Sequence, residues 1–137
     1  MDVVAVMDEV AEKLRAAPSL AGRTFEWPNG KVRPPAAIVT YPPGYDFDKT
    51  YGRGVDTMAG VVVVIVGQVD KRQTRDMFGT YTSGPESIKT LIDGDEGDYA
   101  SCDSVSVVRW ETDTHTIGEI DYLAIVFELA ITGPGTP

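Results

Sequence analysis

Apolar residues recur every three or four positions through the first 17 residues, which is the spacing of one face of a helix. Charged residues occupy the other face, and Glu9 and Lys13 are placed for a favourable i,i+4 pair. Pro18 ends the pattern, because the residue before a proline avoids the helical region. The sequence therefore predicts an amphipathic helix over residues 2–17.

The most apolar stretch of the chain, residues 57–66, has a different pattern. Its β-branched residues follow one another without alternating, as in a strand that is buried on both faces. We expect this strand at the centre of a sheet, since at an edge it would promote aggregation. Shorter strands are predicted over residues 24–27 and 36–41, and a long loop over residues 42–55 follows them.

Two short helices are expected after the central strand. The first covers residues 74–81, whose larger apolar side chains share one face. The second opens at Ser83, because Ser83 and Glu86 have the spacing of a capping box, in which each side chain binds the other residue's backbone N–H. Asp93 and Gly94 form a plausible end for this helix.

A β-hairpin is predicted at the end of the chain. Its strands, residues 103–113 and 120–132, flank a turn at residues 115–118. The apolar positions of the first strand change phase between Val107 and Val108, which indicates a bulge or a twist.

These elements predict an α+β fold. We expect a mostly antiparallel or mixed sheet of about four to five strands, with the N-terminal helix and the two short helices packed on one face. Residues 1–132 form a single domain in this interpretation, and residues 133–137 form a short flexible tail.

The net charge of the chain limits the classes of molecule that it can bind. The 137 residues include 12 Lys and Arg against 21 Asp and Glu, for a formal net charge of −9. Such a chain is unsuited to DNA binding through phosphate contacts, which needs clustered basic residues. It begins without a basic region followed by an apolar run, and its longest apolar run, residues 61–66, is too short to cross a bilayer. We therefore expect a cytosolic protein that does not associate with membranes.

Catalytic chemistry has few candidates in this sequence. His115 is the only histidine and Cys102 the only cysteine, and neither has a neighbouring nucleophile or base in a recognisable pattern. The acidic loop at residues 93–98 lacks the glycine and the closing glutamate of a calcium-binding loop. We predict no enzymatic activity, no bound metal and no cofactor.

Three groups of residues are candidates for contacts with other proteins. They are aromatic and basic side chains of the long loop, a basic cluster after the central strand, and the acidic loop. The residues are Tyr41, Tyr45, Phe47, Tyr51 and Arg53; Lys71, Arg72 and Arg75; and Asp95, Glu96 and Asp98. Aromatic side chains are frequent interface anchors, but these could equally fold back onto the domain's own core. The basic cluster is either a clamp for an acidic partner or a solvated helix face, and the acidic loop is either functional or a solvated linker.

The organisation of the chain resembles a known family. After the central strand comes Val66-Gly67-Gln68-Val69-Asp70-Lys71-Arg72, and between the short helices comes Tyr81-Thr82-Ser83-Gly84-Pro85-Glu86-Ser87-Ile88. With the N-terminal helix and the closing hairpin, this resembles the tail terminator proteins of long-tailed (siphovirus-type) bacteriophages, particularly those of actinobacteria. Residues 61–92 carry most of the resemblance, which extends over nearly the whole chain.

The resemblance implies a structural function. Tail terminators close into a hexameric ring that caps the tail tube, stops tube polymerisation and offers the attachment surface for the head connector. The implied partners are copies of the chain itself, the tail tube protein and the head–tail connector or adaptor proteins, and genomic DNA passes through the lumen without specific binding. The implied location is the host cytoplasm during assembly and then the tail or neck of the virion.

Two other classes of function stay open. One is another head–tail connector, neck or minor tail subunit, which would share the size and composition of this chain. The other is a small cytosolic enzyme or ligand-binding domain, whose pocket would be built from residues distant in sequence.

Overall fold

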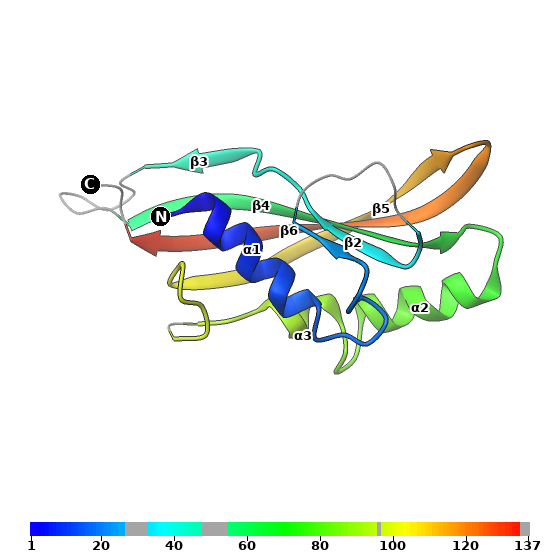
Figure 1. Cartoon of the computed structure of the whole chain (residues 1–137), viewed down its shortest axis with the longest axis horizontal. Helices are drawn as coiled ribbons and strands as arrows, with labels where there is room; N and C mark the ends of the chain where they lie inside the picture. Colours follow the sequence, from blue (N-terminus) through cyan, green and yellow to red (C-terminus); the bar gives the residue numbers. More distant parts are fainter. Residues whose placement is uncertain (27–32, 48–54, 96, 135–137) are drawn as a thin grey trace.

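The computed structural model describes residues 1–26, 33–47, 55–95 and 97–134, which form three helices and one six-stranded sheet (Figure 1). The elements are α1 (Val3–Leu14), β1 (Thr24–Phe25), β2 (Ala36–Val39), β3 (Gly44–Asp46), β4 (Val55–Gln68), α2 (Arg72–Thr82), α3 (Ile88–Ile92), β5 (Ser104–Ile117) and β6 (Ile120–Pro134). The strand order is β1-β2-β4-β6-β5, with β3 also paired to β4. Among the described strands only β1 and β2 run parallel to each other, so the predicted mixed, mostly antiparallel α+β fold is confirmed.

Helix α1 forms where the apolar spacing predicts it, but it ends at Leu14 rather than near residue 17. Asp2 caps its first turn, with a carboxylate oxygen accepting a hydrogen bond from the Ala5 N–H at 3.1 Å. The buried face carries Val6, Met7, Val10, Ala11 and Leu14. These side chains join those on the helix-covered face of the sheet in one hydrophobic core.

Strand β4 occupies the predicted central position. Strand β6 pairs along one of its edges, and β2 and β3 share the other. On the helix-covered face Val62, Val64 and Val66 are buried, whereas on the opposite face Val61 and Val63 are only half-buried. The prediction of complete burial on both faces was therefore wrong for the middle of the strand, because all the described helices pack on one side.

The predicted loop over residues 42–55 contains a strand that the sequence interpretation missed. Strand β3, Gly44–Asp46, pairs antiparallel with residues 57–59 of β4. Glycine and aspartate are poor strand formers, so local propensity gave no signal for it.

The predicted capping box at Ser83 was wrong. The Ser83 hydroxyl donates to the Gly79 carbonyl at 2.9 Å and so closes the end of α2. Helix α3 begins five residues later with Ser87 as its N-cap, whose oxygen accepts from the Thr90 N–H at 3.3 Å. Gly84, between the two helices, has a φ of 91°, which breaks the chain direction before a capping box could form.

The closing hairpin is longer than predicted. Strands β5 and β6 pair as far as Ile117 and Ile120, and the turn is Gly118-Glu119, with φ values of 56° and 70°. Positive φ at both central residues is the mark of a type I′ turn, which suits the twist of a two-stranded ribbon. The predicted bulge is confirmed by a register shift between Val107 and Arg109.

The C-terminal segment continues the sheet, since β6 runs through Gly133 to Pro134. The remainder of the expected tail, residues 135–137, lies outside the described residues. None of the described helices is long and apolar enough to span a membrane.

Candidate interaction surfaces

The aromatic segment around β3 divides into one anchored and two exposed side chains. Tyr45 packs against the core, and its hydroxyl donates a hydrogen bond of 2.5 Å to the fully buried carboxylate of Asp56. Phe47 lies against Tyr45, with ring centroids 4.7 Å apart, and is 67% exposed. Tyr41 is 71% exposed. The core interpretation therefore holds for Tyr45, whereas Tyr41 and Phe47 are available to a partner.

Two of the candidate residues from this loop, Tyr51 and Arg53, lie outside the described residues. Glu96, from the acidic loop, does so as well. Asp95 and Asp98 on either side of it form a local turn. The Asp98 carboxylate accepts from the Asp95 N–H at 2.9 Å, and the Asp98 N–H donates to the Asp95 carbonyl at 3.0 Å. Over the described parts of the chain, no three Asp, Glu, His or Cys side chains converge as a metal site would require.

The basic cluster lies at the start of α2. Lys71 is the N-cap residue of this helix, Arg72 and Arg75 follow in its first turns, and all three side chains are exposed. Within the described residues none of them forms an ion pair with a carboxylate. The positive end of the helix dipole lies at the same place, so this region attracts negative charge.

A cleft of about 440 Å³ opens beside this cluster. Lys71 and Arg23 contribute positive charge to its walls, and Val66, Met77 and Pro35 contribute apolar surface. The cleft thus combines cationic and apolar groups, which suits a peptide segment carrying both carboxylates and aliphatic side chains.

The candidate residues therefore do not form one site. Figure 1 shows β3 and the loop leading into β5 at one end of the elongated molecule, and α2 at the other. The aromatic and acidic groups thus lie far from the basic cluster, and a partner that contacts all three would have to span the length of the domain.

A fourth surface was not predicted from the sequence. Residues 108–121, which form the distal part of the β5–β6 hairpin, are all exposed. Four large apolar side chains in this segment are at least 41% exposed: Val108, Trp110, Ile117 and Ile120. Four carboxylates lie on the same segment: Glu111, Asp113, Glu119 and Asp121. We call this segment the hairpin arm; Figure 1 shows the turn between β5 and β6 at the same end of the molecule as α2 and bent away from the helices.

The contact between the helices and the sheet ends at a defined point along the arm, although β6 still pairs with β4 as far as Tyr122. Trp110 makes an edge-to-face contact with Phe78 of α2, with ring centroids 5.4 Å apart, and this is the last aromatic contact between the arm and the helices. Before that point the edge of β5 is covered. Gly94 exchanges two backbone hydrogen bonds of 2.9 Å with Val105.

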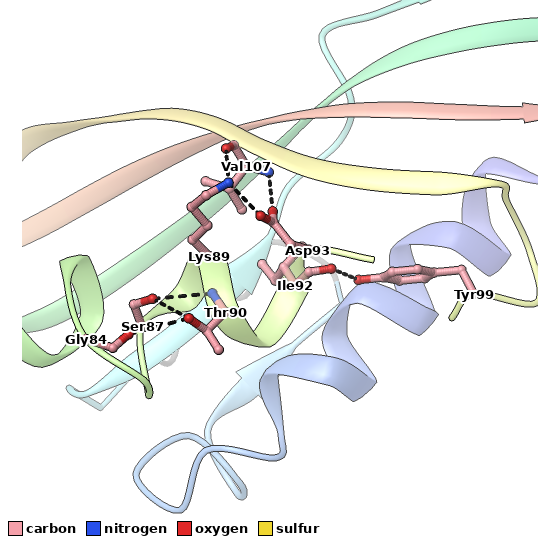
Figure 2. Close-up of polar contacts among 8 residues, drawn as sticks. All are labelled: Gly84, Ser87, Lys89, Thr90, Ile92, Asp93, Tyr99 and Val107. Atoms are coloured by element: carbon pink, nitrogen blue, oxygen red, sulfur yellow. Dashed lines mark hydrogen bonds and ion pairs between the residues drawn. The ribbon is translucent and has the colours of Figure 1, made fainter. Parts of the chain in front are cut away.

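Side chains of α3 and its C-terminal end continue this cover over the edge of β5 (Figure 2). The Asp93 carboxylate accepts from the Val107 N–H at 2.7 Å, and Lys89 donates to the Val107 carbonyl at 3.2 Å while pairing with Asp93 at 2.5 Å. The Tyr99 hydroxyl donates to the Ile92 carbonyl and fixes the following loop. The base of β5 is thereby held to the domain, and the arm starts where this cover ends.

The candidate catalytic residues are not brought together. Cys102 precedes β5, whereas His115 lies near its distal end, so most of a 14-residue strand separates them, or roughly 35 Å at the usual rise per residue. Cys102 is buried, and burial together with the nearby carboxylates of Glu9 and Asp103 raises the pKa of its thiol to about 11. A nucleophilic cysteine needs the opposite shift.

Comparison with known proteins identifies a shared fold. No model of a known protein family matches the sequence, and no curated protein matches it. Among solved structures, a chain from the virion of a native gene transfer agent (GTA) particle is similar, with a TM-score of 0.59 at 12% sequence identity. The similarity covers 90% of this chain and 92% of that chain. The domain therefore has the fold of a protein found in a virion particle.

Proposed function

We propose that this chain is a structural subunit of a phage-like virion, and specifically a tail terminator. In this function copies of the chain close into a ring on the end of the tail tube, stop further tube subunits from adding, and present a surface to the head connector. The observation that carries the proposal is the fold shared, over nearly the full length of both chains, with a chain of a gene transfer agent virion.

Features of the surface support a function in assembly. The exposed Tyr41 and Phe47, on either side of β3, and the hairpin arm offer separate contact surfaces, as a subunit with neighbours in several directions requires. By contrast, Cys102 and Tyr81, whose pKa values are raised by burial, lie in the core and not at an open site.

The net charge fits a ring through which DNA passes. Each copy carries −9, so a ring of six is strongly anionic. A lumen lined with carboxylates repels the phosphate backbone and so lets DNA pass without binding. In this proposal the chain folds in the host cytoplasm and then becomes part of the virion, at the junction of tail and neck.

Loss of the chain tests the proposal directly. Particles assembled in its native host without a functional copy should have tails longer than the normal length, because nothing stops tube growth, and those tails should lack heads. Electron microscopy of normal tails should place the protein at the head-proximal end of the tube. Tails of normal length that merely fail to join heads would contradict the terminator function and favour a neck or connector subunit instead.

A further inference from the structure

We propose that the hairpin arm of one copy of this chain binds in the basic cleft of the next copy, and that this contact, repeated around the ring, sets the order of subunits. The inference rests on the proposed function in that it assumes assembly of identical copies. The contact is heterologous, because two different surfaces of the same chain meet, and such contacts form a ring when the rotation between successive copies closes.

The arm combines carboxylates with exposed apolar side chains, as a segment that binds another protein surface does. Its outer part, from Glu111 to Asp121, holds four carboxylates and no Lys or Arg. At its tip Ile117 is 41% and Ile120 is 42% exposed. Along most of the arm β6 also pairs with β4, but beyond the pair of Gln68 with Tyr122 only β5 and β6 continue, and such a two-stranded ribbon is marginally stable in water. A partner that covers the tip would therefore stabilise it.

The cleft has the complementary composition. Lys71 and Arg23 line it, and Arg72 and Arg75 stand beside it on α2. Within the described residues Lys71, Arg72 and Arg75 have no carboxylate partner, although the chain as a whole is acidic. Val66 and Met77 provide an apolar floor for an aliphatic side chain. Positive charge without a carboxylate partner among the described residues thus lies where the acidic arm of another copy would balance it.

The cleft and the tip of the arm lie at the same end of the sheet, because the cleft is also lined by Gln68 of β4 and Tyr122 of β6, and Tyr122 directly follows the arm. Beyond the pair of Gln68 with Tyr122, β5 and β6 continue past the end of β4, so the tip is the part of the arm that can enter a cleft of another copy. Because the tip and the cleft are different surfaces, each copy can give its arm to one neighbour and receive an arm from the other.

Exchanging the charges tests the contact. One variant carries Lys71→Glu and Arg72→Glu, and the other carries Glu119→Lys and Asp121→Lys. Sedimentation velocity of the purified full chain at low salt should show oligomers for the unchanged protein, and each variant alone should associate about tenfold more weakly or worse. An equimolar mixture of the two variants should associate again, because each cleft then meets an arm of opposite charge. High salt should weaken the association of the unchanged protein, since exposed charges are screened.

A matched control for the arm variant carries Glu12→Lys and Glu86→Lys, which changes the net charge by the same amount and in the same direction at exposed sites outside the arm and the cleft. It should associate like the unchanged protein, and circular dichroism should show all variants folded. The proposal is overturned if the unchanged chain stays monomeric at low salt, if either variant associates normally, or if the mixture fails to recover. If the arm binds another virion protein instead, the unchanged chain should stay monomeric at low salt.

The contact between arm and cleft and the terminator function can be rejected independently of each other. A ring on the tube end in which the arms contact something other than the neighbouring cleft would leave the terminator function intact and reject this contact. Recovery in the mixture, with the protein located away from the tail end, would support this contact and reject the terminator function.

Discussion

The carboxylate of Glu9 on α1 accepts a hydrogen bond of 2.9 Å from the N–H group of Ser101, which lies 92 residues further along the chain. The same carboxylate accepts from the Ala100 N–H at 2.8 Å and from the Ser101 hydroxyl at 2.6 Å. One side chain thereby ties the first helix to the loop that leads into β5, and so fixes where the final hairpin starts.

Replacing Glu9 with Gln should destabilise the protein by about 1–3 kcal/mol, because hydrogen bonds to a charged acceptor are worth more than those to a neutral one. Urea unfolding at pH 7 measures the difference. Glu12→Gln is the matched control, since Glu12 is exposed on the same helix and should change stability little. Equal effects of the two substitutions would show that the Glu9 contact contributes nothing specific.

The same contact predicts a dependence on pH. Burial alone would raise the pKa of the Glu9 carboxyl, but the hydrogen bonds from Ser101 and Ala100, together with nearby Lys13, lower it below its ordinary value of 4.5. A lowered folded-state pKa means that the stabilisation is complete above the unfolded-state value and is lost as the pH falls through the folded-state value.

The stability advantage of the unchanged protein over Glu9→Gln should therefore be constant near neutrality and shrink from about pH 5 downward. Thermal unfolding of both proteins at a series of pH values measures it. A gap that keeps its full size at pH 3 would contradict this assignment.

Apolar spacing was sufficient to predict α1, β4 and the final hairpin, because each has a long pattern that a packed core reinforces. It failed at Ser83, where the capping-box spacing is present but the positive φ of Gly84 directs the chain elsewhere. It also missed β3, whose Gly44–Asp46 segment owes its extended conformation to pairing with β4 rather than to its own residues.

The hairpin arm could not be predicted for a different reason. Its residues alternate like those of any strand, and their exposure depends on how far α2 and α3 extend over the sheet. The cover ends near Trp110, which is a property of tertiary packing and not of the sequence around it. Of the candidate interface residues, Lys71 and Arg72 precede the helix predicted over residues 74–81, whereas α2 begins at Arg72, and the sequence gave no sign of the cleft beside them.

Replacing each serine near α3 should distinguish the two possible caps. Ser87→Ala removes the acceptor of the Thr90 N–H and should cost about 1 kcal/mol, the usual value for a lost N-cap. Ser83→Ala removes only a bond to the exposed end of α2 and should cost less. Chemical denaturation of both variants provides the comparison, and a larger loss for Ser83→Ala would favour the capping box that the sequence predicts.

Tyr45 should contribute more to stability than its half-buried ring alone indicates. Tyr45→Phe keeps the ring but removes the hydroxyl that donates to Asp56, whose side chain is fully buried. We expect a loss of about 1–3 kcal/mol, because a buried charged acceptor then loses a donor. Tyr41→Phe, at a residue that is 71% exposed, is the control and should leave the unfolding midpoint nearly unchanged. A neutral effect of Tyr45→Phe would mean that other groups satisfy the Asp56 carboxylate fully.

The tip of the hairpin arm predicts a ranking of substitutions at a single position. Glu119 has a φ of 70°, a left-handed conformation that costs most residues about 1–2 kcal/mol relative to glycine. Glu119→Gly removes this cost but raises the conformational entropy of the unfolded chain. The free energy of unfolding should therefore increase by about 0.5–1 kcal/mol. Glu119→Val should be less stable than the unchanged protein, since a β-branched side chain tolerates positive φ least. Amide hydrogen exchange of the arm should therefore be slowest in the glycine variant and fastest in the valine variant. The opposite order would contradict a type I′ turn at Gly118-Glu119. It would imply that the strands of the arm pair in a different register.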